Sequence, residues 1–137
     1  MAQKSWLEKL RDPKPHEVKP APTDIAGMKA GQIMLVPTPA MIESFIRSLP
    51  AGMSVDVRIM REVLATRYRA EVTCPIYTGF HLRTVAEAAY VGYKHGIPLA
   101  EITPFWRVIE RKTPTAQRLG CGVEFIRKRR QQEGLNP

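Results

Sequence analysis

The sequence has no apolar run that approaches the roughly 18 residues needed to span a bilayer. Its first residues lack the long hydrophobic segment of a secretory signal. It has only two cysteines, Cys74 and Cys121, and neither stands in a metal-binding spacing such as C-x-x-C. We therefore expect a soluble cytoplasmic protein in a reducing compartment, with no disulfide framework, no metal, no cofactor and no membrane partner.

Negative charge is also scarce, because 13 Asp and Glu stand against 21 Lys and Arg, a formal net charge of +8. Such an excess favours an anionic partner, and nucleic acid is the commonest one, although an acidic protein attracts by the same field. The 137 residues suffice for one domain with a real core and are too few for two. Composition therefore indicates a class of partner and leaves the oligomeric state open.

The N-terminal part is predicted to be an arm. Prolines at positions 13, 15, 20 and 22 remove backbone donors, which favours extended chain over a helix or a central strand. Before them, residues 5–10 favour one or two helical turns with Trp6 and Leu10 on one side, and we expect Trp6 to dock on the domain. A basic arm that grips phosphate is the alternative. The predicted division is an arm, residues 1–31, and a domain, residues 32–137.

Hydrophobic periodicity in the domain predicts a short strand at residues 32–36 and helices near residues 39–49, 55–69, 79–94 and 123–132. Residues 72–77 are β-prone but contain Pro75, so we expect a loop or an edge strand there. Thr78 and Gly79 are read as the start of the next helix. The fold class that follows is α+β, mostly helical: a winged helix-turn-helix-like single domain with an extended N-terminal arm.

The helix pair 55–69 and 79–94 has the order of a loose helix-turn-helix, in which the second helix enters a groove of DNA. Its outer face and the preceding loop supply the candidate DNA-binding residues, which are Tyr77, Thr78, Arg83, Thr84, Glu87 and Lys94. Arg83 and Lys94 suit phosphates or base edges, whereas Glu87 suits only a cytosine amino group. The pair alone is common in helical domains and carries little weight.

Four short segments make the pattern more specific, because they match the motifs of one protein family in the order in which that family has them. They are the turn Pro50-Ala51-Gly52, the helix segment Arg83-Thr84-Val85-Ala86-Glu87-Ala88, the loop Pro104-Phe105-Trp106-Arg107-Val108, and the closing Cys121-Gly122 with Glu133-Gly134. In these matches residues 38–134 resemble the DNA-binding domain of O6-alkylguanine-DNA alkyltransferases and their non-catalytic alkyltransferase-like relatives. The loop stands where that family has Pro-Cys-His-Arg-Val. The resemblance implies a winged helix-turn-helix that binds the minor groove of double-stranded DNA and flips a base, with Arg83 as the wedge.

The departures from that family concern its chemistry. Phe105 stands in place of the nucleophilic cysteine and Trp106 in place of the histidine, so alkyl transfer is excluded at this site and only Glu133 of the catalytic set remains. The resemblance therefore predicts a non-enzymatic DNA-binding protein, with altered or flipped bases as its expected ligands. Phe105 and Trp106 either stack on a base or fill the former pocket as core. Arg107 is expected to bond nearby carbonyls.

Two other functions stay open. One is an RNA-associated or protein-interaction module that keeps the fold but does not bind DNA. The other is an enzyme that uses Cys74 as a displaced nucleophile, with His81 as the nearest histidine in sequence. The basic run at residues 127–130 is read as a solvated helix end that adds general attraction, because four consecutive side chains on a helix cannot face one partner.

Overall fold

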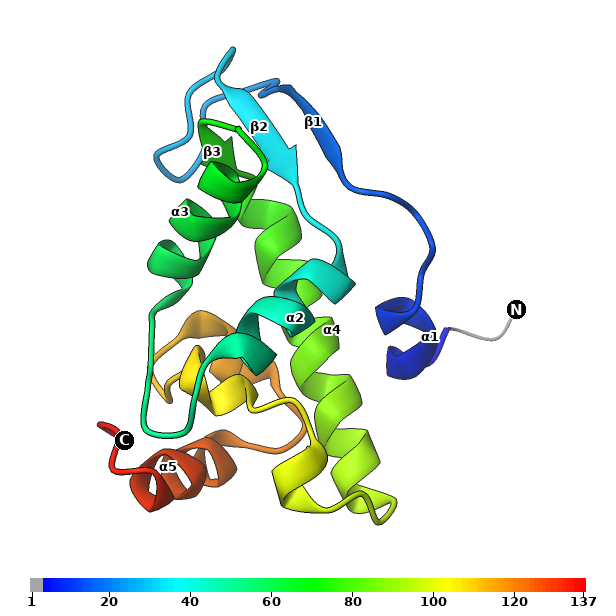
Figure 1. Ribbon diagram of the computed structural model, residues 1–137, viewed down its shortest axis with the longest axis vertical. Helices are drawn as coiled ribbons and strands as arrows, with labels where there is room; N and C mark the ends of the chain where they lie inside the picture. Colours follow the sequence, from blue (N-terminus) through cyan, green and yellow to red (C-terminus); the bar gives the residue numbers. More distant parts are fainter. Residues whose placement is uncertain (1–3) are drawn as a thin grey trace.

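The computed structural model describes residues 4–137. Its elements in chain order are α1 (Trp6–Leu10), β1 (Glu17–Pro20), β2 (Ile33–Val36), α2 (Pro39–Ser48), α3 (Val57–Arg67), β3 (Val72–Thr73), α4 (Pro75–Lys94), the short 3-10 helices η1 (Leu99–Glu101), η2 (Phe105–Arg107) and η3 (Pro114–Arg118), and α5 (Val123–Gln132). The sheet lies at one end and α5 at the other, with α4 between them (Figure 1). The predicted α+β, mostly helical class is confirmed.

The sheet has three strands in the order β1-β2-β3. β1 runs antiparallel to β2 with Glu17 opposite Val36, and β2 runs parallel to β3 with Met34 opposite Val72. The extended character predicted for the proline-rich segment is therefore right, but its pairing with β2 was not expected. Proline is tolerated because β1 is an edge strand. The division of the chain at residue 31 stays a prediction, although part of the predicted arm completes the sheet.

The predicted start of α4 is wrong. Only Val72 and Thr73 of the β-prone segment form a strand, and the helix begins at Pro75 instead of Thr78 or Gly79. Proline suits the first helical position because its missing donor has no partner there. The Thr78 hydroxyl donates back to the Cys74 carbonyl at 2.7 Å, inside the first turn. Arg83 consequently lies well inside the helix, away from its N-terminus.

The other helices agree closely with the periodicity. Thr38 caps α2, and the predicted stripe of Ile42, Phe45, Ile46 and Leu49 is buried. Asp56 caps α3, which ends two residues before the predicted limit, and α5 has the predicted bounds. These stripes meet α4 and residues 102–109 in one core. In the described part of the chain, no helix has the length and apolarity that crossing a membrane requires.

Candidate functional site

The loop that resembles the alkyltransferase active site is built into the core. Phe105 is 0% exposed and belongs to the short helix η2. Its ring meets the Trp106 ring edge-on at 5.4 Å and stacks on Phe125 of α5 at 6.0 Å. Of the two interpretations given above, core filling therefore describes Phe105, because its ring has no face left for a base.

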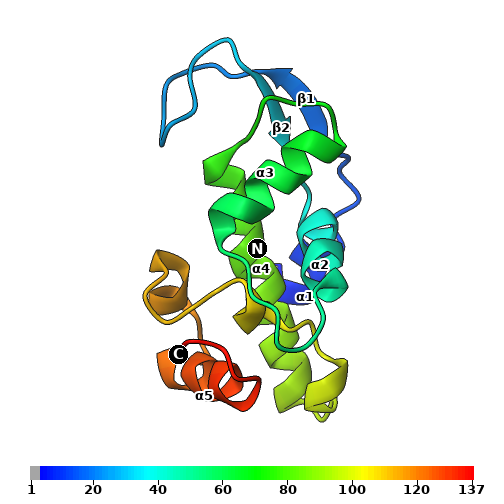
Figure 2. The same ribbon diagram turned by 60° about the vertical axis from the view of Figure 1, so that its left-hand side comes forward.

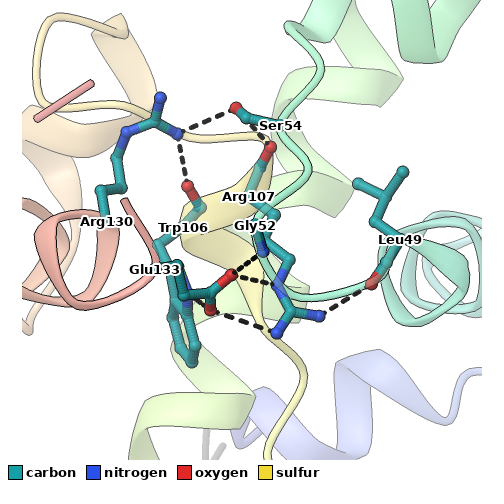
Figure 3. Close-up of polar contacts among 7 residues, drawn as sticks. All are labelled: Leu49, Gly52, Ser54, Trp106, Arg107, Arg130 and Glu133. Carbon is teal, nitrogen blue, oxygen red and sulfur yellow. Dashed lines mark hydrogen bonds and ion pairs between the residues drawn. The ribbon is translucent and has the colours of Figure 1, made fainter. Parts of the chain in front are cut away.

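Trp106 and Arg107 converge on one carboxylate at the end of α5 (Figure 3). The Trp106 indole donates Nε1 to Glu133 Oε2 at 2.6 Å, and Arg107 donates Nε to Oε1 at 2.8 Å and Nη2 to Oε2 at 3.1 Å. The Gly52 amide donates to Oε1 at 3.0 Å. Arg107 also donates Nη1 to the Leu49 carbonyl at 2.7 Å, as predicted for its side chain. Glu133 is thus fully occupied as an acceptor.

The environment of Glu133 keeps it ionised. Burial acts to raise its pKa, but the hydrogen bonds from Arg107, Gly52 and Trp106 outweigh burial, and the pKa lies below its ordinary value. A carboxylate held in this state does not supply protons near neutral pH. Its role is to tie η2 to α5 and to the turn that follows α2.

Arg130 was not recognised from the sequence, and the solvated helix end predicted for residues 127–130 is wrong at this position. Arg130 is 6% exposed and donates Nη1 to the Trp106 carbonyl at 2.6 Å and to Ser54 Oγ at 3.1 Å. Ser54 in turn donates to the Arg107 carbonyl at 2.9 Å (Figure 3). Arg127 pairs with Glu124, the half-buried Arg129 places its guanidinium 4.9 Å from the centre of the Phe125 ring, and Lys128 is exposed.

The candidate DNA-binding residues on α4 separate into two groups. Thr78 and Thr84 are 1% and 6% exposed, and each hydroxyl donates to a carbonyl one turn earlier in the helix. Glu87 is 6% exposed and accepts from the Gly120 amide at 2.9 Å. All three side chains are buried and hydrogen-bonded inside the fold, which does not favour contact with DNA, and their role in binding stays a prediction.

Arg83 is partly exposed but held from two sides. Its Nε lies 3.4 Å from Glu87 Oε2, and its guanidinium lies 5.2 Å from the centre of the Trp6 ring. The predicted docking of Trp6 is confirmed by this contact. α1 and α5 lie on opposite sides of α4 in both ribbon views (Figure 2). An arginine engaged in this way is less available as a wedge than the resemblance implies.

Three of the four large apolar side chains of α4 that are exposed lie in its first half. Ile76, Tyr77 and Phe80 are 44%, 43% and 61% exposed, and together with Arg83 they form what we call the outer face. A hollow of about 340 Å³ lies between this face and η3, and Arg118 lines its wall on the η3 side. Lys94 is exposed at the far end of the helix. Phe80 and Arg118 were missed because each lies outside a periodic stripe.

The displaced-nucleophile hypothesis gains no support from the geometry. Cys74 is 4% exposed in a second apolar cluster with Ala21, Met28 and Met34. The His81 ring pairs with Tyr77 at 5.8 Å between centroids, and burial lowers the pKa of His81. Within residues 4–137, His, Cys, Asp and Glu side chains do not assemble into a group that could hold a metal ion.

Comparison of the chain with protein-family models, with curated proteins and with solved structures gives no match. The resemblance to alkyltransferases stays a prediction.

Proposed function

We propose that this protein is a non-enzymatic, alkyltransferase-like DNA-binding protein that contacts duplex DNA through the outer face of α4. The observation that carries the proposal is the exposure of Phe80, 61%, on a helix whose other bulky apolar residues include the fully buried Leu82. An apolar ring exposed beside Arg83 and Arg118 suits a partner that offers both stacked bases and phosphates.

The proposed contact uses Phe80 as the inserted side chain. Proteins that bind the minor groove often push apolar wedges between base steps, which partly unstacks them. Phe80 is free of the ion pair and ring contact that hold Arg83, and it lies one turn earlier in the helix. In this account α3 and α4 form the helix-turn-helix, and Arg83 approaches phosphate from beside the wedge.

The net charge of +8 supports the electrostatic part of binding. Arg118, Arg83 and the exposed Lys94 would contact phosphates, each adding to the salt dependence. An altered or unstacked base is the preferred target, because a step that is already weakened costs less to open. A protein-interaction or RNA-associated module is the second candidate, favoured by the apolar trio Ile76, Tyr77 and Phe80.

The test is a titration of normal and O6-alkylated duplexes of one sequence, at about 50 mM and 200 mM salt. We expect binding to both duplexes that weakens with salt, with tighter binding of the alkylated one. Equal affinity for the two duplexes contradicts base recognition. Failure to bind either duplex more tightly than a basic protein of equal charge favours the interaction module.

A further inference from the structure

The hollow beside η3 borders the outer face on one side. On the other side, a cavity of about 460 Å³ lies between α4 and the N-terminal segment. One wall comes from α1 and the residues that follow it, and includes Trp6. The opposite wall comes from α4, with Tyr77 and His81, and residues 36–39 complete the lining. The volume falls in the range of roughly 300–1,000 Å³ that small-molecule sites occupy.

Aromatic rings line both of these walls. Trp6 is partly buried on the side of α1, Tyr77 is 43% exposed on α4, and Phe80 borders the opening. The Tyr77 and His81 rings are tilted by 35° with their centroids 5.8 Å apart. Rings on facing walls suit a flat ligand, since every nucleobase has faces that stack on aromatic side chains.

The charge of the cavity favours an anion. The charged residues of its lining are Lys9, Asp12, Lys14, Glu17 and Arg83. Glu17 already lies 2.9 Å from Lys19, and the Asp12 carboxylate accepts the Lys14 amide at 3.0 Å. Lys9 places its ammonium 4.4 Å from the centre of the Trp6 ring. Lys9 and Arg83 therefore stand beside the Trp6 ring, Arg83 in its ion pair with Glu87, and both carboxylates of the lining have partners.

We propose that this cavity binds one unpaired nucleotide, with its base against Trp6 and Tyr77 and its phosphate near Lys9 and Arg83. The inference rests on the proposed function, because the nucleotide belongs to the DNA held by the outer face. A duplex end or a strand opened by Phe80 supplies such a nucleotide next to the cavity. The N-terminal segment is then part of the binding site, where it forms the wall opposite α4.

The experiment compares two labelled duplexes of one sequence, one blunt and one with a short single-stranded overhang. We expect the full chain to bind the overhang duplex about tenfold more tightly, the effect of one stacked base. Trp6→Ala removes this preference, whereas Trp6→Phe keeps most of it. Tyr77→Ala, on the opposite wall, lowers the preference without touching α1.

Leu7→Ala is the matched control, because Leu7 is 46% exposed on the same helix and does not line the cavity. It keeps the preference for the overhang. Equal binding of the two duplexes by the unmodified chain, or a preference that survives Trp6→Ala, overturns the inference and leaves the proposed function standing. Absence of binding to both duplexes instead contradicts the proposed function itself.

Discussion

Arg107 and Glu133 form a bidentate ion pair, with Nε to Oε1 at 2.8 Å and Nη2 to Oε2 at 3.1 Å. Both side chains are largely buried, with 16% and 14% exposed. The pair joins the segment that resembles an active-site loop to the end of α5. The glutamate that the resemblance assigns to a catalytic set therefore holds the fold together in this chain.

Glu133→Ala is expected to lower the free energy of unfolding by about 2–4 kcal/mol, because it leaves the Arg107 guanidinium buried without its partner. Chemical denaturation measures the change. Glu124→Ala is the control on the same helix, because the Glu124 side chain is 62% exposed in its pair with Arg127 and an exposed ion pair contributes little to stability. Equal losses in the two variants would contradict the structural role of Glu133.

Acid should destabilise the protein partly through Glu133. Its hydrogen bonds hold the folded-state pKa below the ordinary value of 4.5, despite the opposing effect of burial. A lowered carboxylate pKa contributes stability above the unfolded-state pKa, and this contribution is lost as the pH falls through the folded-state pKa. Denaturation curves at several pH values should show a weaker acid dependence for Glu133→Gln than for the unmodified chain. Parallel dependences would refute the assignment.

Arg83→Ala is expected to affect stability as well as binding. Glu87 has 8% of its side chain exposed, so removal of Arg83 leaves a nearly buried carboxylate with fewer partners and costs about 1–2 kcal/mol. Adding Glu87→Gln should recover part of that loss, which a double-mutant cycle of unfolding free energies measures. A loss in the double variant equal to the sum of the losses in Arg83→Ala and Glu87→Gln would show that the two side chains are not coupled.

The sequence predicted the elements whose signals are local. Thr38 followed by proline and an apolar stripe specifies α2 within a few residues, and Asp56 does the same for α3. The α+β class followed from such signals. β1 could not be predicted, because its pairing partner β2 lies beyond an intervening loop and a run of prolines indicates only extended chain.

The candidate site was harder to predict, because packing between segments that are distant in the sequence leaves no local signal. Position on a helical wheel places Thr84 and Glu87 on the outer side of α4, but both are buried: Thr84 donates to a carbonyl of its own helix, and Glu87 accepts from the loop before α5. Arg130 looked like one more surface cation, yet it donates into the core to the Trp106 carbonyl. Only tertiary packing distinguishes these residues from Phe80, which remains exposed.

The central claim is that the outer face of α4 binds DNA, and a salt-dependent duplex titration of Phe80→Ala/Arg118→Ala tests it most directly. Both residues are exposed, so the fold should persist, and Val91→Ala, 42% exposed on the same helix, is the control. We expect the double variant to bind at least about tenfold more weakly. Its slope of log K against log salt should be less steep by about 0.9, one lost phosphate contact. Double-variant affinity and slope equal to those of Val91→Ala would contradict the account.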